Sequence, residues 1–274
     1  MKITAPVRID ISAGWPDSDP YRLDHGGVVL NAAINMRISA RFEGPNLITS
    51  LEQVPQSSGL GTSAALRAAY VVASNPGFLK RDEGFRYELI RKVWRFENEL
   101  LEQRAGFQDQ AAAIFGGVNL WSFSPYGKIE RVPVERDKTR HLQDRLTLVY
   151  TGDVHLSANI HDLVFGKGNY QRNVPKLARM KQMAGEMRHG LDNVKTMAEL
   201  INETWELQKS LHDSIETDKM RDLQRQLKGK YLACRATGAG GGGCMIFYHH
   251  PDVVIDAEGK IPFKFEYEGI RAEE

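Results

Sequence analysis

The chain of 274 residues has almost no net charge and no long apolar run. Its 36 Lys and Arg residues face 35 Asp and Glu residues, which leaves a formal net charge of +1 and no general basic field for nucleic acid or an anionic membrane. No stretch approaches the roughly 20 apolar residues of a membrane-spanning helix, and residues 1–6 lack the apolar core of a signal peptide. We therefore expect a cytoplasmic protein with neither a nucleic-acid nor a membrane partner.

Cysteine is also scarce. The two cysteines, Cys234 and Cys244, flank a glycine run and do not show a spacing typical of a metal site. This pattern predicts two reduced thiols in adjoining strands and gives them no chemical role.

Apolar periodicity divides the chain into strands, then helices, then strands again. In the first part we expect strands at residues 7–11, 28–42, 47–51, 118–121 and 129–134, the second and third of them half-buried. Helices are expected from Ser63, at about 82–103 and through 111–115.

The polar stretch 135–143 has no sustained apolar period, which favours a boundary between domains at 1–140 and 141–274. After it we expect a strand at 146–150, three helices between 174 and 230, and strands at 234–237 and 244–248. This order predicts an α+β architecture rather than a doubly wound parallel sheet.

The run from Pro55 to Ala65 is the most informative motif, because a glycine turn with hydroxyls leads directly into an alanine-rich helix. Glycines let backbone N–H groups turn toward an anion, and the helix start adds its positive dipole end. Ser63 offers an oxygen to a metal held by phosphates. A turn of this kind also serves simply to cap a helix.

Two carboxylates follow. Asp109 stands at the start of a helical segment after Gly106, a position that suits either a functional carboxylate or an ordinary helix-start residue. Glu97 lies near the end of the preceding helix, where a carboxylate is usually part of a solvated face.

A second glycine loop, Gly238 to Gly243, lies between two expected strands. Five glycines in six positions favour a close backbone approach over a flexible linker. Near the amino terminus, Arg8 supplies a fixed positive charge and Asp17 an acceptor suited to a polyol, although surface turns also use aspartate.

Together and in this order, these motifs resemble those of the GHMP kinases, which include galactokinase, homoserine kinase, mevalonate kinase and phosphomevalonate kinase. Residues 5–8 are similar to the family's amino-terminal motif, 55–65 to its phosphate motif and 237–243 to its carboxy-terminal glycine motif. Residues 14–17, 25–34 and 108–110 resemble the branch that contains fucokinase and D-glycero-D-manno-heptose 7-phosphate kinase. The resemblance spans nearly the whole chain.

The resemblance implies a two-domain GHMP kinase fold with the active site in the cleft between the domains. It implies that Asp109 is the catalytic carboxylate with Arg8 beside it, and that Ser63 and Glu97 hold Mg²⁺. The implied ATP-binding residues are Pro55, Ser57, Ser58, Gly59, Leu60, Gly61, Thr62, Ser63 and Ala64. The implied substrate-binding residues are Asp17, His25, Gly26, Gly238, Ala239 and Gly240.

The chain departs from the family pattern at several positions. Thr62 replaces a serine, Phe107 a tryptophan and Arg235 a lysine. The interval from Arg41 to Pro55 is short, and in this branch that interval helps to hold the nucleotide base.

The resemblance implies ATP-dependent phosphorylation of a sugar or sugar phosphate at its anomeric hydroxyl, of the L-fucose or D-glycero-D-manno-heptose 7-phosphate type. Two alternatives stay open, a non-catalytic nucleotide- or sugar-binding homologue and a kinase for a non-sugar alcohol. The sequence indicates neither which sugar is used nor the oligomeric state.

Overall fold

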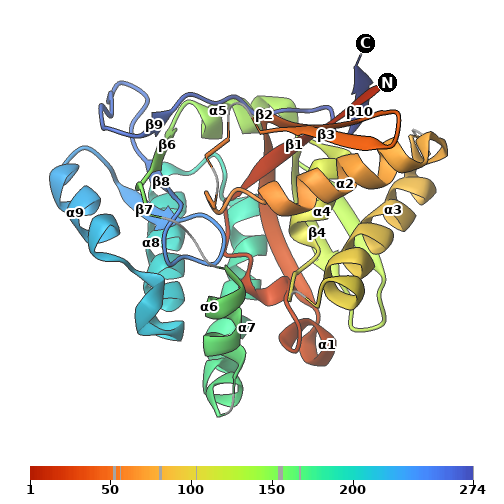
Figure 1. Ribbon diagram of the computed structural model, residues 1–274. Helices are drawn as coiled ribbons and strands as arrows, with labels where there is room; N and C mark the ends of the chain where they lie inside the picture. The colour runs from red at the N-terminus through yellow and green to blue at the C-terminus, as the bar shows by residue number, and fades with distance from the viewer. Residues whose placement is uncertain are drawn as a thin grey trace.

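Two antiparallel sheets organise the molecule, seen here in a computed structural model (Figure 1). It describes residues 1–51, 54–55, 57–79, 82–102, 104–153, 157–166 and 168–273, except for the side chains of 157–159. In order across the first sheet lie β10 (Arg271–Glu273), β1 (Lys2–Asp10), β2 (Gly27–Glu43), β4 (Val118–Phe123) and β5 (Ile129–Pro133), with β3 (Asn46–Ser50) paired to β2. The second contains β7 (Ala233–Ala236), β8 (Cys244–Tyr248), β6 (Leu146–Tyr150) and β9 (Lys260–Ile261).

Helices α2 (Thr62–Ser74) and α4 (Gln108–Phe115) pack against the first sheet, and α3 (Glu83–Arg95) packs against both helices. Ala64, Ala65, Ala68 and Ala69 are buried, and their small side chains let α2 lie close to β1 and β2. A π-helical turn, η3 (Phe96–Leu100), continues α3. The sequence therefore predicted this helical layer correctly.

The second sheet is covered by α8 (Val194–Leu211), whereas α7 (Asn169–His189) packs on β2 of the first sheet and on α8. The remaining helices are α1 (Tyr21–His25), α5 (Arg136–Gln143), α6 (Ser157–Phe165) and α9 (Asp218–Gln226), with short 3₁₀ turns η1 (Trp15–Asp17), η2 (Pro76–Phe78) and η4 (Asp213–Ile215). The three helices expected between 174 and 230 are thus α7, α8 and α9.

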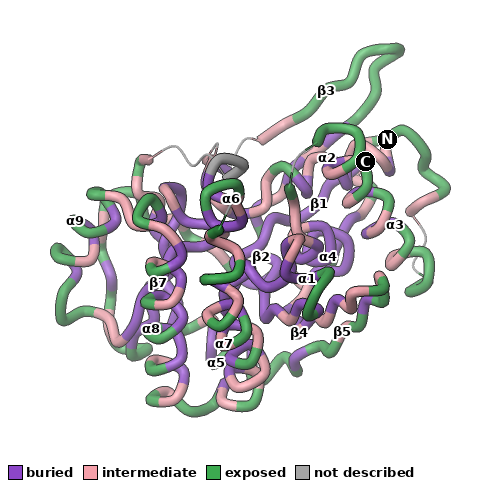
Figure 2. The backbone as a smooth tube through the Cα atoms, turned by 90° about the horizontal axis from the view of Figure 1, so that it is seen from below, coloured by how far each residue is buried: buried purple, intermediate pink, exposed green. Residues whose placement is uncertain are grey.

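One element was not predicted, one burial prediction was wrong, and one helix ends earlier than expected. The polar stretch 135–143, for which no element was predicted, forms α5, which buries Thr139 and Leu142. Strand β3 was expected to be half-buried, but it is exposed along most of its length and extends away from the body of the molecule (Figure 2). The helix expected at 82–103 ends with the π-turn at Leu100, and Gln103 lies outside the described residues.

The carboxy-terminal segment crosses back to the first sheet. β10 pairs with β1, Phe265 forms a bridge with Ile34, and the Gly117 N–H donates to the Glu266 carbonyl at 2.7 Å. Strands that come after residue 140 therefore pair with strands that come before it, and the domain limits 1–140 and 141–274 stay a prediction.

Mixed helices and antiparallel sheets confirm the α+β class. Cys234 and Cys244 are buried free thiols on the paired strands β7 and β8. In the part of the chain that the structure describes, no helix is long and apolar enough to cross a membrane.

Candidate functional site

The glycine turn at the start of α2 opens into a pocket of about 350 Å³. Gly59 and Gly61 both adopt φ +72°, a left-handed conformation that glycine takes without strain. Gly61 is the cap residue of α2 and has no side chain to bond the first N–H groups of the helix. Those donors and the helix dipole make this end of the pocket suited to an anion.

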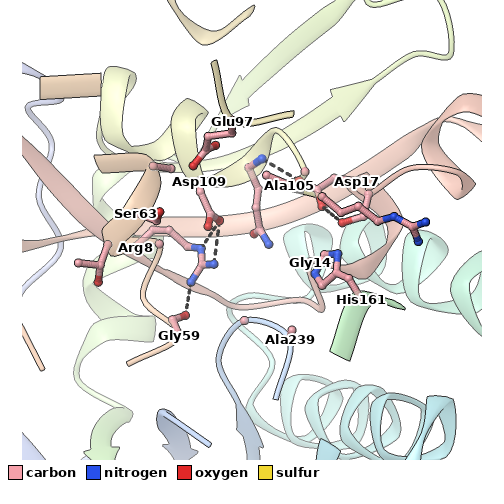
Figure 3. Close-up of a pocket in the computed structure, with 18 of the residues that line it drawn as sticks. Arg8, Gly14, Asp17, Gly59, Ser63, Glu97, Ala105, Asp109, His161 and Ala239 are labelled. Atoms are coloured by element: carbon pink, nitrogen blue, oxygen red, sulfur yellow. Dashed lines mark hydrogen bonds and ion pairs between the residues drawn. The ribbon is translucent and has the colours of Figure 1, made fainter. Parts of the chain in front are cut away.

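Asp109, in the first turn of α4, faces this turn and is held by Arg8 (Figure 3). Arg8 Nε and Nη2 each lie 2.7 Å from Asp109 Oδ1, and Arg8 Nη1 donates to the Gly59 carbonyl at 2.6 Å. A Cβ added at Gly61 would lie 3.1 Å from the Asp109 carboxylate. One arginine on β1 thus fixes the carboxylate against the glycine turn.

Arg8 is itself buried, and burial lowers its pKa. The charges of Asp109, Asp10 and Asp17 and the hydrogen bond to Asp109 together outweigh that effect, so the pKa of Arg8 is raised. Arg8 stays a permanent cation at this position.

The two glycine loops meet through their backbones. A Cβ at Gly59 would lie 2.8 Å from the Thr237 carbonyl, and one at Gly238 would lie 2.8 Å from the Gly59 carbonyl. The Cys244 N–H donates to the Ser58 carbonyl at 2.8 Å. The loop between β7 and β8 therefore lies against the loop that precedes α2, as its glycine content predicted.

Asp17 forms another wall of the pocket and is buried. Its Oδ2 accepts the Gln108 N–H at 2.7 Å, and a Cβ at Gly106 would lie 2.2 Å from its carboxylate oxygens. Burial raises the pKa of Asp17 to about 7, since the hydrogen bond from Gln108 and the charge of Arg8 only partly offset desolvation.

Glu97 lies in the π-turn η3 and is buried rather than part of a solvated face. Its two oxygens accept hydrogen bonds from Arg67 Nη1 and Gln110 Nε2, and Arg67 Nη1 also donates to Ser63 Oγ. Burial raises the pKa of Glu97 to about 7, and the Arg67 charge opposes that rise. Ser63 and Glu97, expected as metal ligands, are thus brought together through Arg67.

Most of the predicted site residues line this one pocket, namely Arg8, Asp17, Ser57, Ser58, Gly59, Gly61, Thr62, Ser63, Ala64, Glu97, Asp109, Gly238 and Ala239. Five do not, namely Pro55, Leu60, His25, Gly26 and Gly240. His25 is exposed beside Tyr21, and Lys181 Nζ donates to its carbonyl at 2.6 Å. Gln56 of the phosphate motif lies outside the described residues.

The pocket also contains side chains that sequence reasoning missed. Arg67 and Arg104 add positive charge, and the Trp15 ring lies beside that of His161 in a tilted arrangement, with ring centroids 4.8 Å apart. The signal for Arg67 was its spacing of four residues from Ser63, which places both on one helix face. Arg104 and His161 lie on separate segments, and their spacing carries no such signal.

The geometry defines an α+β protein with an anion-binding helix start and an arginine-held carboxylate in one pocket, lined from both halves of the chain. Residues 28–117 match the family model described as the GHMP kinases N terminal domain. The chain therefore contains a GHMP kinase N-terminal domain.

Relatives extend the likeness beyond that segment. The chain is 25% identical over 310 residues to a bifunctional fucokinase/GDP-fucose pyrophosphorylase of Arabidopsis thaliana, covering 88% of this chain and 29% of that protein. It is 27% identical over 244 residues to a D-glycero-alpha-D-manno-heptose 7-phosphate kinase of Campylobacter jejuni, covering 86% of this chain and 71% of that protein.

Among solved structures, a D-glycero-D-manno-heptose 1-phosphate kinase from Bacteroides thetaiotaomicron superposes with a TM-score of 0.74 at 20% identity, covering 98% of this chain and 97% of that chain. This likeness confirms the GHMP kinase fold over nearly the whole chain.

Proposed function

We propose that this protein is an ATP-dependent kinase that phosphorylates a sugar or sugar phosphate at its anomeric hydroxyl, of the L-fucose or D-glycero-D-manno-heptose 7-phosphate type. The observation that carries the proposal is the position of Asp109, fixed by Arg8 at 2.7 Å and packed against Gly61 of the glycine turn. A base beside an anion cradle is the arrangement that phosphoryl transfer to a hydroxyl requires. The relatives in fucose and heptose metabolism support the choice of a sugar.

In this proposal the nucleotide phosphates lie along the glycine turn, at residues 57–64, with the start of α2 offering N–H donors. Asp109 accepts the proton of the sugar hydroxyl as its oxygen attacks the terminal phosphorus in line. Arg8 orients the carboxylate through Oδ1 and balances the charge that develops beside it. Asp17, Gly238 and Ala239 line the part of the pocket that we assign to the sugar.

We further propose that the two halves of the chain, residues 1–140 and 141–274, form the two walls of an active-site cleft. The support is that His161, Gly238 and Ala239 line the same pocket as Arg8 and Asp109. We propose a cytoplasmic location, in keeping with two buried free thiols and a need for ATP.

Mg²⁺ enters the proposal only as the ion that ATP brings on its phosphates. The donor set does not form an open cation site, because Arg67 bonds both Ser63 and Glu97 while Arg8 bonds Asp109. Within the described ranges no group of three or more His, Cys, Asp or Glu side chains could hold a metal ion. We therefore assign no step to a protein-bound metal.

The test is ADP release with L-fucose, D-mannose and D-glycero-D-manno-heptose 7-phosphate, comparing the wild type with Asp109→Asn. Loss of the proton acceptor predicts a fall in kcat of about 10²–10⁴-fold. Because Asp109 is assigned to the sugar hydroxyl, the affinity for ATP, measured by calorimetry, changes little. The matched control is Asp222→Asn, which removes an exposed carboxylate of α9 that pairs with Arg225.

Equal turnover by Asp109→Asn and the wild type contradicts the mechanism. ATP binding with no phosphorylation of any sugar favours the non-catalytic alternative. Turnover of mevalonate or homoserine alone favours a non-sugar alcohol as acceptor.

A further inference from the structure

We propose that Arg67 is a nucleotide-binding residue whose guanidinium takes the position between Ser63 and Glu97 and binds the phosphates there in place of a protein-bound divalent ion. In this role Ser63 and Glu97 position Arg67 and are not metal ligands. The inference rests on the proposed function, because it assigns a residue to the phosphates of the proposed substrate ATP.

The first support is geometric. Arg67 follows Ser63 by four residues on α2, so that both side chains lie on one face of the helix. Arg67 Nη1 donates to Ser63 Oγ and to Glu97 Oε1, which joins the start of α2 to the π-turn η3. All three side chains line the pocket that contains the glycine turn. The point at which a shared metal ion would meet both oxygens is thus the point at which the guanidinium lies.

The second support is the surroundings of Glu97, whose side chain is only 3% exposed. Arg67 binds one of its oxygens and Gln110 binds the other. A buried carboxylate needs a paired charge and hydrogen bonds, and these two neighbours supply both. Glu97 is therefore satisfied by this chain's own residues and fixes the guanidinium in place.

The third support is chemical. A guanidinium carries one permanent positive charge and a planar fork of donors that matches the oxygens of a phosphate. Arg67 presents that charge in the same pocket as the start of α2, which already favours anions, and as Gly59 and Gly61 with their left-handed backbone. A residue so placed supplies positive charge to the phosphates without requiring a metal site built by the protein.

The experiment measures ATP binding by calorimetry, once with excess EDTA and once with Mg²⁺, for the wild type, Arg67→Ala and Arg67→Gln. Arg225→Ala is the matched control, since Arg225 lies on helix α9 with its side chain 77% exposed and paired with Asp222. Circular dichroism establishes which variants are folded, and Arg67→Gln keeps a hydrogen-bonding side chain if the alanine variant does not fold.

We expect the wild type to bind ATP in EDTA within about threefold of its affinity with Mg²⁺, and the Arg67 variants to lose about tenfold or more in EDTA, a typical loss for a charge-assisted contact. Arg225→Ala should match the wild type. The inference is overturned if the Arg67 variants bind metal-free ATP as tightly as the wild type does. It is also overturned if the affinity of the wild type for ATP is more than about tenfold lower in EDTA than with Mg²⁺.

The two proposals fail in different ways. A wild type that phosphorylates a sugar but binds ATP only with Mg²⁺ leaves the kinase proposal intact and removes the role of Arg67. A wild type that binds no ATP under either condition overturns both.

Discussion

At the scale of the residue, Asp17 fits in the pocket wall because its neighbour Gly106 has no side chain, and the Gln108 backbone holds it there. Gly106 passes so close that any side chain there would meet the Asp17 carboxylate, and the Gln108 N–H bonds its Oδ2 at 2.7 Å. Burial raises the pKa of Asp17 from 3.8 to about 7, so the protein holds a proton on this side chain that the unfolded chain releases. The folded state is therefore favoured at lower pH by this group.

The direction of this pH dependence can be tested by comparing the wild type with Asp17→Asn. Between pH 3.8 and about 7 the folded state binds more protons at Asp17 than the unfolded state, so its contribution to stability is present below that window and is lost as the pH rises through it. We expect the free energy of unfolding of the wild type, relative to Asp17→Asn, to fall by on the order of 2–4 kcal/mol across the window. Urea unfolding at several pH values measures the difference, and a constant difference contradicts the expectation.

The residues of the candidate site were partly predictable. Arg8, Asp109 and the glycine turn could be predicted because each belongs to a short motif whose local backbone sets its place. The spacing of Arg67 from Ser63 could place both on one helix face, but the contact of Arg67 with Glu97 could not be predicted, because it forms only where the π-turn brings Glu97 against α2. His25 lies near Asp17 in the sequence but outside the pocket, because α1 carries it to an exposed position beside Tyr21.

At the scale of the element, the contact between the two glycine loops joins the start of α2 to the turn between β7 and β8. Gly59 and Gly238 are each too close to the opposite backbone for a side chain, and Thr237 Oγ1 donates to the Gly59 carbonyl at 3.3 Å. The cradle is therefore supported by a segment almost 180 residues further along the chain.

Gly59→Ala tests this contact, with Gly44→Ala as its matched control. Both glycines have positive φ, +72° and +59°, but an added Cβ meets the Thr237 carbonyl at 2.8 Å only at Gly59, and meets nothing within 4 Å at Gly44. Both variants should lose roughly 1–2 kcal/mol of unfolding free energy from backbone strain. Gly59→Ala should lose about 1–3 kcal/mol more and also bind ATP more weakly. Equal losses in the two variants would exclude the loop contact as the cause.

The elements themselves were largely predictable from apolar periodicity, and the failures have physical causes. α5 was missed because only Thr139 and Leu142 of its eight residues are buried, which leaves no sustained apolar pattern. β3 was expected to be half-buried because its residues alternate, but among the described strands it pairs with β2 only, and four of its five residues are exposed. Apolar periodicity therefore predicted whether a segment is a helix or a strand better than it predicted how far that segment is buried.

At the scale of the whole molecule, Arg235 joins the two sheets. It is fully buried on β7, and its Nη2 lies 3.2 Å from Asp10 Oδ2 on β1 and 3.1 Å from Gln208 Oε1 on α8. Asp10 Oδ1 accepts the Gly238 N–H at 2.9 Å, which ties the second glycine loop to the same pair. The ion pair between Arg235 and Asp10 therefore links β1 to β7 and, through Gly238, to the pocket.

Arg235→Leu should therefore destabilise the protein by about 3–5 kcal/mol, because it leaves the Asp10 carboxylate buried without its cation. Urea unfolding measures the loss. Arg225→Ala, with its exposed side chain, should stay within about 0.5 kcal/mol of the wild type. A similar small effect at Arg235 would show that Asp10 is satisfied by other neighbours.

The pairing of β10 with β1 has a consequence for how the chain is made. On the ribosome Lys2, Ile3 and Thr4 emerge more than 260 residues before their partners Glu273, Ala272 and Arg271. Until then the β1 edge of the first sheet offers unpaired N–H and C=O groups to other strands. Completion of that sheet therefore waits until β10 has been synthesised, and during that interval the unpaired edge raises the risk of aggregation.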